Sequence, residues 1–275
     1  MPSFDTGPRH SLGRRIMTLL AIMGPGVVVM AANNDAGSLA IWAQAGQDHS
    51  ASLLWLLVGL APILFVIQEM VARLGAVTGA GHARLIFERF GRRWGTFALA
   101  DLLVLNLVTI VTEFIGVSLA LGYFGVSRFV SVPVAALSLA VVTSTGSFRR
   151  WERAMYLLVL VSLAVVPLLA LTQHHPGIRH LASPRSRTGL EGSTVLFVVA
   201  IVGTVVGPWQ LFFQQSTVID KRITARWLSY ERIDTLIGSL LFLVGAFGVL
   251  LACSAAFGGT GLHGGFVREP RSSAM

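Results

Sequence analysis

Residues 31–40 read AANNDAGSLA, and this stretch lies inside an otherwise hydrophobic segment that is long enough to cross a membrane. Asn33, Asn34 and Gly37 are poor helix formers, and asparagine or aspartate side chains can bond the local backbone in place of the helical ladder. Irregular backbone at membrane depth persists only where it is buried in protein or lines a cavity. Two interpretations follow: a kinked helix with a satisfied polar cluster, or a broken helix whose gap forms an ion site.

The composition indicates that most of the chain is embedded in a membrane. Of the 275 residues, 54% are hydrophobic and 12% are charged, whereas soluble domains carry about 25% charged residues. Windows of about 20 apolar residues predict an all-α polytopic membrane protein with about seven transmembrane helices. The predicted spans are 16–45, 53–75, 94–122, 126–146, 153–173, 193–220 and 233–257.

The first span has an alternative interpretation as a secretory signal, because Arg14 and Arg15 precede its apolar run. Six further spans follow, and the run does not end in a clear cleavage site. We therefore interpret it as a membrane span. The chain has one cysteine, Cys253, so the sequence predicts no disulfide framework.

The net charge of +8 comes mostly from one side of the predicted spans. Of the 21 basic residues, 15 lie before the first span or in and beside the loops that follow spans two, four and six. The positive-inside rule places such loops in the cytoplasm. We therefore expect a multi-pass protein of the cell (cytoplasmic) membrane with a cytoplasmic N-terminus. The excess of basic residues is therefore explained by the orientation of the chain in the membrane. We expect the protein to contact the lipid bilayer and not nucleic acid.

Acidic residues inside membrane spans need a physical reason, because an aspartate at mid-span costs about 2.5–3.5 kcal/mol on insertion scales. Asp101 lies within two turns of a span end and is expected to reach the interface. Glu69 is expected to pair with Arg73, four residues later on the same helix. No such account fits Asp35 or Glu113, which are therefore the candidate functional acids.

The sixth span contains a second predicted break, in the stretch GTVVGPWQLFFQQS at residues 203–216. Pro208 has no N–H, and its ring clashes with the carbonyl four residues earlier, which frees the Thr204 carbonyl inside the membrane. A kink without function is the alternative, since proline is common in membrane helices. Interrupted helices at matching places in two halves are nevertheless typical of transporters built from inverted repeats, which bind substrate at the midplane.

Four stretches carry a resemblance to a known family: GPGVVVMAANNDAGSLAIWAQAG, QEMVARLGAVTGAG, TEFIGVSLALGYFGVSR and VGTVVGPWQLFFQQSTVIDK. Together they resemble the NRAMP-type divalent metal ion transporters, in a divergent bacterial branch, over residues 20–257. The resemblance implies a LeuT-like bundle of two inverted five-helix repeats with broken helices one and six. The expected divisions are a cytoplasmic tail at 1–15, a first repeat at 16–173, an extracytoplasmic loop at 174–192, the start of the second repeat at 193–257 and a polar tail at 258–275.

The resemblance also implies metal ligands from both broken helices. The family motif Asp-Pro-Gly-Asn falls on residues 35–38, and Met-Pro-His-Asn falls on residues 207–210. Glycine replaces the family's thioether ligand, which leaves an oxygen-only pocket suited to a hard ion such as Mg²⁺ or Mn²⁺. The implied metal ligands are Asp35, Ser38, Thr204, Gly207 and Gln210, and Glu113 is a candidate for an ion or proton pathway.

The expected function is transport of a divalent metal cation by alternating access, with no cofactor. An enzyme is disfavoured because the sequence has no membrane-embedded histidine pair, nucleophile–base pair or P-loop. All seven histidines lie outside the predicted spans, so proton coupling stays open. The alternatives are an inactive or incomplete transporter fragment and a carrier of another small solute. A second chain that completes the helix bundle is a further expectation.

We expect an impermeant thiol reagent applied to intact cells to label His49→Cys and to leave Arg92→Cys unlabelled, in a background with the native Cys253 replaced by serine. Arg92 lies in a basic loop that the positive-inside rule places in the cytoplasm, whereas His49 lies in the loop on the opposite side. Labelling after permeabilisation controls for burial of either site. Labelling at Arg92→Cys with none at His49→Cys would reverse this topology.

Overall fold

The computed structural model describes residues 24–144, 146, 153–157, 159 and 192–257. This part of the chain consists of helices joined by short turns and contains no strand. The elements are α2 (Pro25–Ala32), α3 (Ala36–His49), η1 (Ser50–Leu53), α4 (Leu54–Thr78), α5 (His82–Tyr123), α6 (Arg128–Ser144), α9 (Gly192–Val205), α10 (Pro208–Asp220), η3 (Ala225–Trp227) and α11 (Leu228–Phe257). Most of the predicted fifth span, the loop at 174–191 and both predicted tails lie outside the described residues.

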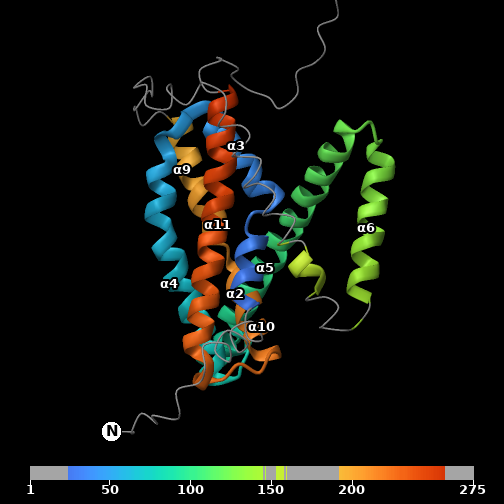
Figure 1. Ribbon diagram of the computed structural model, residues 1–275. Coiled ribbons are helices and arrows are strands. Elements are labelled where there is room, and N and C mark those ends of the chain that lie inside the picture. The colour runs from blue at the N-terminus through green and yellow to red at the C-terminus, as the bar shows by residue number, and fades with distance from the viewer. Residues whose placement is uncertain (1–23, 145, 147–152, 158, 160–191, 258–275) are drawn as a thin grey trace, which may run out of the picture.

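In the described part of the chain, four helical segments are long and apolar enough to cross a membrane: Ala51–Thr78, His82–Tyr123, Val195–Asp220 and Ala225–Ala255. The helix α6 is apolar but shorter. Figure 1 shows α3, α4, α9 and α11 side by side in one bundle, while α5 runs to the side and pairs with α6. The prediction of an all-α polytopic membrane protein is confirmed.

Both predicted helix breaks are present. The first span divides into α2 and α3 around residues 33–35, and the sixth divides into α9 and α10 around residues 206–207. The backbone of Gly207 is extended, with φ −93° and ψ 138°, and Pro208 then opens α10. Proline suits the first turn of a helix because its missing N–H would have no helical partner there.

One boundary differs from the sequence-based expectation. The third span is predicted to start at residue 94, but α5 starts at His82 and changes direction at Gly91. Gly91 has φ 81° and ψ 176°, a conformation that only glycine adopts without steric cost. The charged segment before Gly91 is therefore helical, although it lacks the apolar window that marks a membrane span.

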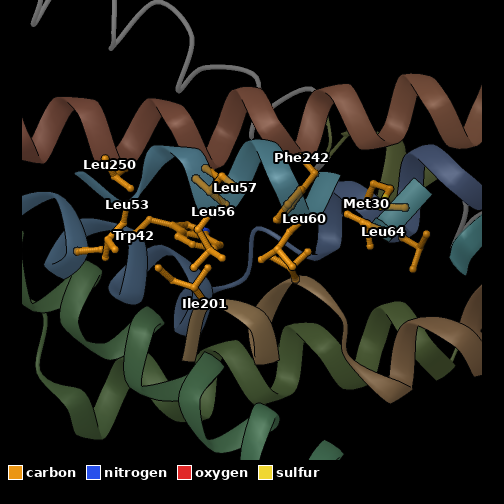
Figure 2. Packing of buried hydrophobic residues seen from close by; sticks show 14 residues of the cluster. Met30, Trp42, Leu53, Leu56, Leu57, Leu60, Leu64, Ile201, Phe242 and Leu250 are labelled. Carbon is orange, nitrogen blue, oxygen red and sulfur yellow. The ribbon is translucent and has the colours of Figure 1, made fainter. Parts of the chain in front are cut away.

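The helix α11 lies at the centre of the bundle and packs against α2, α3 and α4. Figure 2 shows the apolar side chains that fill the space between these helices, including Trp42, Leu57 and Phe242. Glycines set the closest approaches, because small residues let the backbones of membrane helices come together. A Cβ atom added to Gly238 of α11 would lie 2.5 Å from the carbonyl oxygen of Gly26 in α2.

We expect Gly238→Ala to destabilise the protein by about 1–3 kcal/mol, which is typical of overpacking, because the added methyl meets rigid backbone rather than a flexible side chain. Thermal unfolding in detergent measures the loss. Gly59→Ala is the matched control, since Gly59 lies within α4 with no atom within 4 Å of an added Cβ. Equal melting temperatures for the two variants would show that the α2–α11 crossing does not need glycine.

Candidate metal site

A chain of side-chain amides connects the two helix breaks. The Asn33 Nδ2 group donates to the Val205 carbonyl oxygen at 3.3 Å, and Gln210 Nε2 donates to Asn33 Oδ1. Gln68 of α4 then donates through Nε2 to Gln210 Oε1 at 2.8 Å. All three amide side chains are at most 1% exposed. The two breaks therefore face each other, and the Val205 carbonyl, which an unbroken helix would bond internally, accepts a hydrogen bond from Asn33.

The helix termini at the breaks supply partial charges. The helices α2 and α9 both end at the breaks. The last carbonyl groups of each helix carry partial negative charge, which favours a cation. Asn34 lies between this region and α11, where its Nδ2 donates to the Phe242 carbonyl oxygen at 3.4 Å. Its amide lies directly over Gly245 of α11, where an added Cβ would be only 2.5 Å from Nδ2.

Two carboxylates meet at the first turn of α3. Asp35 Oδ1 accepts the Ser38 N–H at 2.7 Å, and Glu113 Oε1 from α5 accepts the Ala36 N–H at 3.1 Å. The helix α5 can come this close because Gly116 presents no side chain to Ala36. The two acids are near enough to act on each other electrostatically. The structure thus brings together the two acids for which the sequence offers no structural account.

Asp35 and Glu113 line a cleft of about 580 Å³. Asn34, Asn106 and Thr109 also line it, and the rest of its wall is apolar, including Met155 and Trp209 of α10. Among the described residues, no three His, Cys, Asp or Glu side chains gather closely enough to hold a metal ion. A cation in this cleft would therefore be held by two carboxylates together with neutral oxygens and water.

The other predicted ligands lie at the breaks but not among the residues that line the cleft. Ser38 is 2% exposed, in the first turn of α3. Thr204 Oγ1 donates to the Ile201 carbonyl at 2.9 Å, and the Gly207 carbonyl accepts the Gln210 N–H at 3.2 Å. The Gln210 side chain belongs to the amide chain, so its Oε1 would have to accept Gln68 and a cation together. Their role as metal ligands remains a prediction.

The sequence analysis missed Asn106 as a lining residue, although helical spacing contained the signal. Asn106, Thr109 and Glu113 are separated by three and four residues, which places them on one face of α5. It also missed two buried acids of α11, Glu231 and Asp234, because they lie before or at the start of the predicted seventh span.

The other two acids singled out from the sequence lie away from the cleft. The predicted pairing of Glu69 with Arg73 is confirmed at 2.6 Å, and Arg232 of α11 provides a second partner for the same carboxylate. Asp101 is exposed on α5. Glu69 therefore links α4 to α11, and neither acid takes part in the candidate metal site.

Comparisons with known proteins agree with this architecture. The family model described as natural resistance-associated macrophage protein-like (Nramp) matches residues 26–266. The divalent metal cation transporter MntH of Verminephrobacter eiseniae is 32% identical over 218 residues, which are 76% of this chain and 48% of the relative. The protein of the same name from Levilactobacillus brevis is 30% identical over 264 residues, or 91% of this chain and 57% of the relative.

The fold is also similar to that of a solved structure, a manganese transporter of Eremococcus coleocola. The TM-score is 0.74 and the sequence identity is 23%, and the match covers 92% of this chain and 54% of the other. The chain spans about half the length of the curated relatives that it matches.

Proposed function

The chain belongs to the Nramp family, and from this membership we propose that it takes part in the transport of a divalent metal cation across the cell membrane. Relatives with 30–32% identity carry the name divalent metal cation transporter. The proposed activity is transport by alternating access, with no catalytic step. The metal ion is the substrate and not a resident cofactor.

The observation that carries this proposal is the pair of carboxylates at the first helix break. Asp35 and Glu113 share one cleft inside the membrane-spanning region. Placing an aspartate in the middle of a membrane span costs about 2.5–3.5 kcal/mol on insertion scales. A bound cation would offset that cost. The two carboxylates would instead repel the carboxylate group of an amino acid or any anion, which disfavours a carrier of such solutes.

Oxygen chemistry supports a hard ion such as Mg²⁺ or Mn²⁺ as the substrate. The polar side chains that line the cleft carry carboxylate, amide and hydroxyl oxygens, and Met155 adds one thioether to the apolar part of the lining. At the second break, Gly207 brings no sulfur. Mg²⁺ dehydrates reluctantly and keeps several waters when it binds to proteins, and a cleft of about 580 Å³ has room for them. We include Asp35, Ser38, Thr204, Gly207 and Gln210 in the proposed ligand set, with Glu113 on the ion or proton pathway.

The orientation and the repeat boundaries remain parts of the proposal. We propose a cytoplasmic N-terminus, a first repeat at 16–173 and the start of a second at 193–257. Because the chain spans about half the length of its relatives, a second chain that completes the bundle also stays a proposal. An inactive fragment is the competing reading, and it predicts neither metal binding nor uptake.

We expect Asp35→Asn to weaken Mg²⁺ and Mn²⁺ binding to the purified chain by more than about 100-fold, because loss of a residue that only supports a metal ligand already weakens binding by up to about 100-fold. We also expect the substitution to abolish uptake into proteoliposomes. Asparagine keeps the shape of the side chain and removes one formal negative charge from the proposed site. Ser38→Ala removes a neutral oxygen and should weaken binding less. Isothermal titration calorimetry measures the binding directly.

The matched control is Asp101→Asn, which removes the same charge from an exposed position of α5 outside the cleft. This variant should bind and transport like the unaltered protein. Undiminished binding and uptake in Asp35→Asn would exclude Asp35 as the metal ligand. Transport of an amino acid from a panel, with no metal uptake, would favour the other-solute reading.

We expect Gly207→Met to raise the preference for Cd²⁺ over Mg²⁺, because a thioether favours softer metals. An added Cβ at residue 207 would lie 3.1 Å from the Trp209 ring and 3.4 Å from the Gln210 amide, so the new side chain starts in contact with both. Competition of each metal against one fluorescent reporter gives the ratio.

The control for this substitution is Gly203→Met, which adds the same side chain where nothing lies within 4 Å. It should leave the Cd²⁺-to-Mg²⁺ ratio unchanged. A folded Gly207→Met variant with an unchanged ratio would mean that residue 207 does not face the ion.

A further inference from the structure

A second group of buried polar side chains lies between α10 and α11, away from the cleft. It consists of Gln214 of α10 and Glu231, Asp234 and Thr235 of α11, and none of the four is more than 1% exposed. None of them lines the cleft that holds Asp35 and Glu113. Two buried acids within one turn of a membrane helix are costly, so the partners of each acid determine its state.

Asp234 has the partners of an ionised carboxylate. Its Oδ1 accepts the Gly24 N–H at 3.1 Å, and its Oδ2 accepts the Gly26 N–H at 2.7 Å. Gly24 is the N-cap residue of α2 and Gly26 lies in its first turn, where the unbonded amides and the helix dipole favour a negative charge. Both oxygens are thus occupied by donors, and the carboxylate holds the N-terminus of α2 against α11.

Glu231 lacks such partners. Its Oε1 is 3.5 Å from Gln214 Nε2, at the outer limit of a hydrogen bond, and its Oε2 has no hydrogen-bond partner although it is fully buried. The Gln214 Oε1 atom is also buried without a partner, while Nε2 of the same amide donates to Thr235 Oγ1 at 3.0 Å. The group therefore contains two unsatisfied acceptors, and a proton on Glu231 would remove its charge and add a donor to the group.

The charged groups near Glu231 do not balance the negative charge that it would carry without a proton. Lys221, the residue that follows α10, acts electrostatically on both acids, but Asp234 acts on Glu231 with the opposite sign. Arg232, the next residue along α11, is bonded to Glu69. Within the described part of the chain, Glu231 makes no ion pair that would balance its charge.

We propose that the Glu231 carboxyl is a proton-binding site, which holds a proton while α2 is docked against α11. The Asp234 contacts and the close approach of Gly26 to Gly238 keep α2 over this region. Movement of α2 away from α11 would let water reach Glu231 and let the proton leave. The link between this proton and metal movement rests on the proposed transport function, whereas the site itself does not.

Infrared difference spectroscopy of the full chain in detergent, at neutral pH without metal, tests the site. We expect a carbonyl band of a protonated carboxylic acid that shifts in D₂O and is absent in Glu231→Gln. Glu88→Gln is the matched control, since Glu88 is exposed and paired with Arg84 at 2.7 Å, and it should leave the band in place. Glutamine resembles the protonated acid, so Glu231→Gln should unfold at the same temperature as the unaltered protein.

An unchanged band in Glu231→Gln would overturn the proposal, and so would a clear loss of thermal stability in that variant, because an ionised Glu231 would then be contributing to the fold. Loss of the band when Na⁺ is added to the unaltered protein would show that the group binds a metal cation instead of a proton. These measurements need no metal transport. A protein that failed to bind or transport metal would refute the proposed function and leave the proton site testable.

Discussion

Hydrogen bonds between the two interrupted helices are the constraint on which the rest of the structure depends. The backbone around residues 33–35 and 206–207 leaves polar groups that the lipid cannot satisfy. Asn33 of the first break bonds the Val205 carbonyl that the second break leaves free, and Gln210 bonds the Asn33 side chain in turn. The two breaks therefore hold each other in place, and the cleft lies beside them, between α2 and α5.

Both halves of the first span begin at a carboxylate. The first turn of α3 bonds Asp35 and Glu113, and the first turn of α2 bonds Asp234 of α11. Breaking a membrane helix creates an additional N-terminus, whose free N–H groups and dipole attract negative charge. The break in the first span thus partly stabilises Asp35 and Glu113, which also line the cleft, whereas both oxygens of Asp234 are occupied by N–H groups at the start of α2.

Close packing around α11 holds these groups in position. Gly26 and Gly238 allow the α2–α11 crossing, Gly245 leaves room for the Asn34 amide, and Gly116 lets α5 bring Glu113 to α3. In a bilayer, helix association depends on close van der Waals contact and on hydrogen bonds between helices. The absence of a side chain at four positions therefore determines which polar groups can reach one another.

Features that depend on local chemistry could be predicted from the residues alone. The breaks follow from Asn33, Asn34 and the Pro208 ring, and the Glu69–Arg73 pair follows from i+4 spacing. The contact between Gln68 and Gln210, and the capping by Asp234 of a helix 208 residues away, became visible only in the folded chain. Such contacts depend on how close two helices come and at what angle they cross, and no local pattern of residues encodes either quantity.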